Sequence, residues 1–222
     1  MLEQDSPRTW RKRMRLSIRG FVLLVLFVGG VLGLVLHRAQ TQRNEVEAIR
    51  KSGGRVFYQW EWKDSSVISN SSPRGPKWLL DRIGVDYMND VVYVELPRRA
   101  TDADLARIVE HFPRLLGLSL DRASVTDDGL KCLAGLTTLQ FLDLANTVVT
   151  DRGLGHLASL PGLHMLNLNH TRISDDGLRS LDRATGLKVL DLSNTRVTND
   201  GVFALEEALT KTMIIHRLYD GR

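Results

Sequence analysis

Four consecutive stretches of this sequence repeat with a period of 24 residues. They cover residues 112–135, 136–159, 160–183 and 184–207, and a shorter, looser copy begins at Asp90. Each copy carries nearly the same phrase: VTDDGL at 125–130, VTDRGL at 149–154, ISDDGL at 173–178 and VTNDGV at 197–202. A period of this length is typical of a solenoid, in which each copy forms one coil and stacks on the next.

Each copy combines two hydrophobic periodicities. Its first half reads L-x-x-L-x-L, which sends the leucines to one face of a strand, and its second half places leucines one helical turn apart. In the second copy these leucines are Leu139, Leu142 and Leu144 in the strand half and Leu154, Leu157 and Leu160 in the helix half. A single copy cannot bury both faces. We therefore predict an α/β fold, a right-handed solenoid in which a parallel sheet is backed by short helices around one leucine core.

The repeated phrase marks the start of each short helix. Its hydroxyl can accept a hydrogen bond from a free backbone N–H, its aspartate lies at the positive end of the helix dipole, and its glycine allows neighbouring coils to approach closely. The hydroxyls are Thr126, Thr150, Ser174 and Thr198, the aspartates Asp127, Asp151 and Asp175, and the glycines Gly129, Gly153, Gly177 and Gly201. The G-G-x-G-x-D pattern of calcium-binding solenoids is absent from the sequence. We interpret the aspartates as structural rather than as metal ligands or catalytic acids.

The pattern L-x-x-L-x-L-x-x-[TN] followed by V-T-D-x-G-L resembles that of leucine-rich repeat proteins over Asp90–Leu209. It is most similar to the ribonuclease-inhibitor-like and cysteine-containing subclasses, which have a true helix in each coil. The layout also resembles that of bacterial single-span membrane proteins with leucine-rich repeats, including a GP-x-WL segment at 75–79. The chain departs from the family where an inward asparagine is usual. Those positions hold Ala123, Thr147, Thr171 and Thr195.

A single apolar stretch, Gly20–Leu36, precedes the repeats. As a helix its 17 residues would span about 26 Å, slightly less than a bilayer core of about 30 Å, and flanking basic side chains can cover the difference. Residues 1–19 carry six basic and two acidic residues, so the positive-inside rule places the N-terminus in the cytoplasm and the repeats outside, in the periplasm or extracellular space. We predict an uncleaved single-pass anchor, and the alternative is a cleaved signal peptide.

The segments beside the repeats complete the division of the chain. VFYQWEW at 56–62 predicts one strand with Val56, Tyr58, Trp60 and Trp62 on the same face, most simply as a cap on the open end of the solenoid. KWLLDRIG predicts a short helix ended by Gly84, and Met213–His216 predicts a closing strand. We divide the chain into a basic tail at 1–19, an anchor at 20–36, a stalk at 37–54, an N-terminal cap region at 55–89, leucine-rich repeats at 90–209 and a C-terminal cap at 210–222.

The residues between the strand leucines are the candidates for a binding surface, because they project from the free, concave face of the sheet. One row is largely apolar and the next is largely acidic, a combination that suits a partner segment with hydrophobic anchors and basic side chains. The candidate partner-binding residues are Tyr93, Phe141, Met165 and Val189 in the first row and Glu95, Asp143, Asn167 and Asp191 in the second.

Other classes of function find little support in the sequence. The residues after position 19 carry no net charge, which argues against nucleic-acid binding. The histidines have no metal-ligand spacing, no phosphate-binding or G-x-S-x-G motif is present, and the lone Cys132 reads as a structural thiol. We therefore expect no catalysis, no metal and no cofactor. The sequence predicts a membrane-tethered module that binds a protein or a cell-envelope polymer. The alternatives are an adaptor in protein turnover, because similar repeats occur in ubiquitin-ligase substrate receptors, and an uncharacterised hydrolase.

Overall fold

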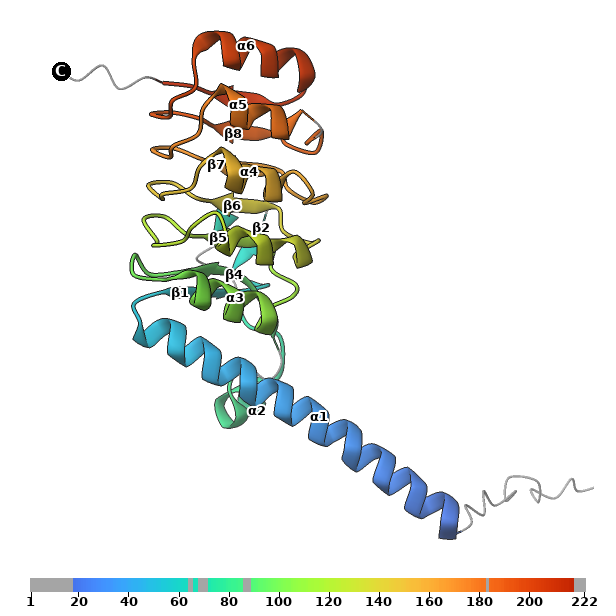
Figure 1. The fold of residues 1–222 in the computed structure, drawn as a ribbon. Coiled ribbons are helices and arrows are strands. Elements are labelled where there is room, and N and C mark those ends of the chain that lie inside the picture. The colour runs from blue at the N-terminus through green and yellow to red at the C-terminus, as the bar shows by residue number, and fades with distance from the viewer. Residues whose placement is uncertain (1–17, 64–65, 68–71, 86–88, 183, 218–222) are drawn as a thin grey trace, which may run out of the picture. The chain divides into compact units, whose positions relative to one another are not determined.

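The structure is a computed structural model that describes residues 18–63, 66–67, 72–85, 89–182 and 184–217 (Figure 1). The chain divides into two compact units, Met1–Arg38 and Ala39–Arg222. The helices are α1 (Ile18–Lys51), α2 (Lys77–Ile83), α3 (Asp102–His111), α4 (Asp151–Leu157), α5 (Asp175–Leu178) and α6 (Asn199–Ala208), and the 3-10 helices are η2 (Gly129–Gly135) and η3 (Arg179–Leu181). The strands are β1 (Arg55–Tyr58), β2 (Trp62–Lys63), β3 (Ser66–Val67), β4 (Val91–Glu95), β5 (Gly117–Ser119), β6 (Phe141–Asp143), β7 (Met165–Asn167), β8 (Val189–Asp191) and β9 (Met213–Ile215).

One seven-stranded sheet runs through the second unit in the order β1-β4-β5-β6-β7-β8-β9. The strands from β4 to β9 are parallel, and β1 is antiparallel to β4. From β5 onward each residue pairs with the residue 24 positions later, so that Leu118, Leu142, Leu166 and Leu190 stand opposite one another. Figure 1 shows the resulting stack of coils, with one strand and one short helix or turn per coil. The predicted α/β solenoid is confirmed.

A single column of leucines forms the core of the solenoid. The strand leucines and the helix leucines of successive coils are all buried in the same cluster, which extends from Val46 to Leu209. Burial of one leucine side chain stabilises a fold by roughly 1.5–3 kcal/mol. No coil could gain this energy alone, because its leucines need those of the next coil to cover them.

The helix-start phrases connect each coil to the next in a way that the sequence analysis did not predict. The carboxylate of Asp127 accepts hydrogen bonds from the backbone N–H and the hydroxyl of Thr150, at 2.8 and 2.6 Å. Asp151 makes the same two bonds with Ser174 of the following coil. The complete series is Asp102–Thr126, Asp127–Thr150, Asp151–Ser174 and Asp175–Thr198. We call this series the corner ladder.

The corner ladder corrects the predicted role of the hydroxyls. We expected each hydroxyl to accept from its own helix, but only Thr198 does so, from the N–H of Gly201 at 3.2 Å. In all four coils the hydroxyl donates to the aspartate of the preceding coil. The predicted role of the glycines is confirmed. A Cβ on Gly153 would lie 2.4 Å from an oxygen of Asp127, and the other three glycines meet the same obstacle.

The threonines that replace the family's inward asparagine bond locally rather than across coils. Thr147 and Thr171 are buried, and each donates its hydroxyl to the carbonyl three residues earlier, at 2.7 and 2.6 Å. The residue before each of the positions 123, 147, 171 and 195 has a left-handed backbone, with φ between 55° and 60°. These residues are Arg122, Asn146, His170 and Asn194.

The end of α1 is part of the folded unit, which corrects the predicted stalk. The segment Ala39–Lys51 belongs to the same compact unit as the repeats, and its Val46 and Ile49 side chains are buried in the core cluster. Glu45 also pairs with Arg107 of α3 at 3.1 Å. The stalk was expected because this segment is mostly polar. Its two large apolar residues, Val46 and Ile49, lie one helical turn apart, and this is enough to cover the first coil.

The aromatic segment at 56–62 is not one strand. Strand β1 ends at Tyr58, a turn closed by the bond from the N–H of Glu61 to the carbonyl of Tyr58 follows, and Trp62 begins β2. Val56 and Tyr58 face the core, as predicted, while Trp62 lies against Tyr93 on the concave face. The helix α2 ended by Gly84 and the closing strand β9 agree with the predictions.

The first part of α1 carries the apolar stretch. Its side chains from Phe21 to Leu36 are exposed. By length and composition, this is the one helix among the described residues that could cross a membrane.

Candidate functional site

The predicted rows of the concave face are present and in register. The first row consists of Tyr93, Gly117, Phe141, Met165, Val189 and Met213. The second row consists of Glu95, Ser119, Asp143, Asn167, Asp191 and Ile215. Strand β9 therefore adds a sixth position to each row. Met213 and Ile215 could have been predicted from the sequence, since they follow Val189 and Asp191 by 24 positions.

An aromatic cluster covers the N-terminal end of the first row. Trp62 stacks on Tyr93 with ring centroids 4.4 Å apart, and Phe141 meets both rings at 6.3 and 5.9 Å. Tyr93 is only 7% exposed, and this burial raises the pKa of its hydroxyl above the ordinary value. The structure thus places Tyr93 beneath Trp62, so this predicted contact residue is not open to a partner.

Trp62 itself was missed by the sequence analysis, but the sequence does contain a signal for it. Gly117 is the smallest residue in a row of large side chains. A Cβ at Gly117 would lie 2.3 Å from the ring of Tyr93 and 3.3 Å from that of Trp62. A glycine at this point of the row indicates that bulky rings cross it from elsewhere in the chain.

Acidic and amide side chains of the second row close a turn at the end of each strand. One oxygen of Asp143, Asn167 and Asp191 accepts a hydrogen bond from the backbone N–H two residues later, at 3.0, 3.0 and 2.8 Å. Such Asx turns end an extended segment by satisfying a backbone donor locally. These three predicted contact residues therefore have a structural task as well, and each remains partly exposed.

The N-terminal part of the second row is the most acidic region of the face. Asp143 also accepts from the hydroxyl of Ser119 at 3.3 Å, and its pKa is raised mainly by burial, with smaller contributions from Asp121 and Glu95. Glu95 forms an ion pair with Arg55 of β1, so the cap neutralises this end of the row. A hollow of about 550 Å³ lies here, bordered by Gly53, Arg55, Glu95, Arg98, Asp121 and Asp143.

The open part of the first row lies toward the C-terminus. Phe141, Met165 and Val189 are half-buried, and Met213 is 58% exposed. They form a continuous apolar strip across β6, β7, β8 and β9, beside Asp143, Asn167 and Asp191. We call these seven residues the concave strip.

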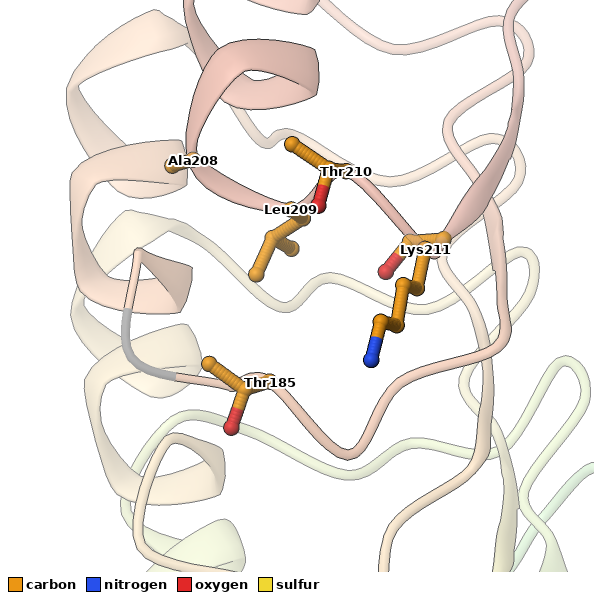
Figure 2. A pocket seen from close by; sticks show the side chains of 6 residues that line it. Thr185, Ala208, Leu209, Thr210 and Lys211 are labelled. Carbon is orange, nitrogen blue, oxygen red and sulfur yellow. The ribbon is translucent and has the colours of Figure 1, made fainter.

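Another cavity, of about 340 Å³, lies at the last coil (Figure 2). It is lined by Thr185, Ala208, Leu209, Thr210, Lys211 and Thr212. A similar gap separates the preceding coils, between Leu157–Leu160 and Ala184–Gly186. Lys211 is the one titratable side chain on the lining of the first cavity. These cavities are spaces between neighbouring coils, with no set of residues suited to acid–base or nucleophilic chemistry.

Several side chains that could bind a metal or act as a nucleophile bond to backbone carbonyls. Among the described residues no group of three or more histidine, cysteine, aspartate or glutamate side chains could hold a metal ion. A ring nitrogen of His111 bonds the carbonyl of Arg107 at 2.8 Å, and one of His216 bonds the carbonyl of Val197 at 3.1 Å. Cys132 bonds the carbonyl of Gly129 and is half-buried, and burial raises the pKa of its thiol. The thiol is thus less reactive than a free cysteine.

Comparison with known proteins identifies the repeats. A family model described as Leucine Rich repeat matches residues 135–158, 163–181 and 185–205. No curated protein sequence matches the chain. Among solved structures, internalin C2 from Listeria monocytogenes is similar at 27% identity over 49% of this chain and 44% of that chain, with a TM-score of 0.42. Our chain thus spans less than half the length of this internalin.

Two further solved structures are similar at lower identity. Actin-binding site 2 of leiomodin-1 is 18% identical over 53% of this chain and 78% of that chain, with a TM-score of 0.44. The ectodomain of the receptor kinase SOBIR1 from Arabidopsis thaliana is 11% identical over 80% and 91%, with a TM-score of 0.40. The sequence period, the one-strand coils and the matching family model agree: the coils at 135–158, 163–181 and 185–205 are leucine-rich repeats.

Proposed function

We propose that this chain is a membrane-tethered, non-enzymatic interaction module that binds a protein partner on the concave strip. The observation that carries the proposal is the strip itself. It sets four apolar side chains, one of them 58% exposed, beside a parallel row of acidic and amide groups. An apolar row with polar neighbours is the composition of a protein interface.

The chemistry of the strip favours an extended, basic segment as the partner. Asp191 uses one carboxylate oxygen in its own turn, and the second oxygen makes no hydrogen bond among the described residues. A lysine or arginine could bind this carboxylate while an apolar side chain beside it packs on Val189 or Met213. Four strands about 4.8 Å apart give a strip of roughly 15 Å, which four or five extended residues would cover.

Site-specific photocrosslinking of the full chain in its native membranes tests this proposal. A photoreactive residue at Met165 should give a discrete adduct, whereas one at Arg152, exposed on α4, should give none. The double change Asp143→Lys and Asp191→Lys should abolish the adduct, because it reverses the charge beside the strip. Equal labelling from positions 165 and 152, or an adduct that survives the charge reversal, would refute binding on this face.

The membrane tether is supported by α1. The stretch Gly20–Leu36 is uncharged, the described side chains from Phe21 onward are exposed, and six basic residues precede it. We propose that this stretch spans a bilayer with the N-terminus in the cytoplasm. The chain should resist extraction from membranes by alkaline carbonate, and a protease added from the outside should reach the repeats. A mature protein that lacks residues 20–36 would show a cleaved signal peptide instead.

A further inference from the structure

Helix α2 presents a single large aromatic side chain to the surroundings. Trp78 is 68% exposed, whereas Leu80, two residues later, is buried. Because two residues correspond to about 200° around a helix, the buried leucine fixes the indole on the outer side. The side chains of Arg74, Lys77 and Arg82 are exposed around it, with Asp81 as the one acidic neighbour in α2.

A buried asparagine holds the segment around α2 against α1. Asn89 is buried, and its carbonyl accepts a hydrogen bond from the Gln42 side chain at 2.8 Å. The Asn89 side chain accepts from the N–H of Arg74 at 3.1 Å and donates to the carbonyl of Val85 at 3.0 Å. The Asn89 side chain thus joins the residues before and after α2, and the Asn89 backbone carbonyl joins them to Gln42 of α1.

Gln42 is close to the apolar stretch along the chain. It is six residues after Leu36. A chain extends by at most about 3.6 Å per residue, so Gln42 lies within about 22 Å of Leu36 whatever the angle between the two units. With residues 20–36 in a bilayer, Asn89 and the segment tied to it are held near the headgroups.

We propose that α2 and Arg74 rest on the surface of the bilayer that contains the anchor, with Trp78 in the interface and the three basic side chains facing anionic phospholipids. This inference depends on the tether proposed above, not on the concave strip. Tryptophan favours the membrane interface, and lysine and arginine favour the phosphates of anionic lipids. The bilayer that contains the anchor offers this helix both an interface for the indole and anionic phosphates for the basic side chains.

The test uses the full chain with Trp10→Phe, reconstituted in vesicles of phosphatidylcholine and phosphatidylglycerol with brominated acyl chains. Bromine quenches indole fluorescence only at short range. We expect quenching relative to unbrominated vesicles, and we expect Trp78→Phe to remove most of it. The matched control adds Phe203→Trp to the Trp78→Phe chain, because residue 203 is equally exposed, at 65%, but lies on the last helix. This control should show no more quenching than the Trp78→Phe chain itself.

The outcomes separate this inference from the tether. If the chain resists carbonate extraction but Trp78→Phe leaves the quenching unchanged, α2 does not touch lipid and the inference is wrong while the tether stands. Stronger quenching of the Phe203→Trp control than of the Trp78→Phe chain would mean that the whole solenoid lies on the membrane, which would also overturn a contact specific to α2. Release of the chain by carbonate would refute the tether and the inference together. Equal quenching in vesicles without phosphatidylglycerol would overturn the role of the basic side chains.

Discussion

Two rows of acidic side chains run along the same solenoid, and they differ in what their oxygens do. In the corner ladder, both oxygens of Asp151 are bound by Ser174 of the next coil. On the concave face, one oxygen of Asp191 closes a turn in its own coil. Both rows arise from the same 24-residue period. A periodic row of carboxylates is therefore not by itself evidence of a binding site. The two rows differ in whether a carboxylate oxygen is left to accept a hydrogen bond from a partner, as it is in Asp191 but not in Asp151.

The largest effect should come from removing a ladder carboxylate. Asp151→Ala deletes two charge-assisted bonds and leaves the N–H of Ser174 without its acceptor, which should cost about 3 kcal/mol of unfolding free energy. Asp191→Ala deletes one bond and should cost about 1 kcal/mol. Urea unfolding followed by circular dichroism measures both. Equal losses would erase the distinction between the two rows.

The second prediction uses two glycines of α4. Gly153→Ala places a methyl group 2.4 Å from Asp127 and should cost about 1–3 kcal/mol through overpacking. Gly155→Ala is the matched control in the same helix. Its Cβ would meet nothing closer than 3.9 Å, so it should leave stability unchanged or raise it by up to about 1 kcal/mol. If thermal unfolding shows both variants to be equally stable, the ladder does not require close contact at Gly153.

The third prediction concerns the turn that follows the concave row. His170 has a φ of 55°, a region that asparagine and glycine tolerate better, and equivalent positions hold Asn146 and Asn194. His170→Asn should therefore raise the unfolding free energy by about 0.5–1 kcal/mol, measured by urea unfolding. Asn194→Gly should change it little, because Asn194 has the same backbone conformation. A loss on His170→Asn would mean that the imidazole makes a contribution larger than the backbone strain.

The smallest effect should be the pH dependence of Asp143. Because burial raises its pKa in the folded protein, the folded state binds a proton at pH values where the unfolded state has lost it. The wild type should therefore gain stability relative to Asp143→Asn as the pH falls from 7 through the raised pKa. Unfolding curves at several pH values measure this gain, and carbon NMR of the carboxyl gives the pKa. A pKa at or below 3.8 would contradict the effect of burial.

The parts of the fold that depend on hydrophobic spacing could be predicted from the sequence. The leucine columns, the strand register and the glycines of the ladder all follow from residue type and period. The acceptor of a hydroxyl does not, because the bond from Thr150 to Asp127 depends on the distance between two coils, which residue type and period do not give. The end of α1 was misjudged for a related reason. Only two of its apolar residues, Val46 and Ile49, contact the core, too few for a clear periodic signal.

The candidate site was predictable in position but not in exposure. The two rows follow from alternation along each strand, and the structure places them in register. That Trp62 covers Tyr93 depends on a turn after Tyr58, and the alternation of aromatic residues at 56–62 concealed that turn. The sequence shows which residues share a face of the sheet. It does not show which of them a distant segment covers.

The bonds of the corner ladder join only consecutive coils. A copy of 24 residues brings its own donor and acceptor, so gene duplication or deletion of one copy would leave matching ends. Each added coil would lengthen the concave strip by about 4.8 Å without new chemistry at the junctions. The size of the recognised ligand can therefore change in fixed steps during evolution, while the residues that build the coil stay the same.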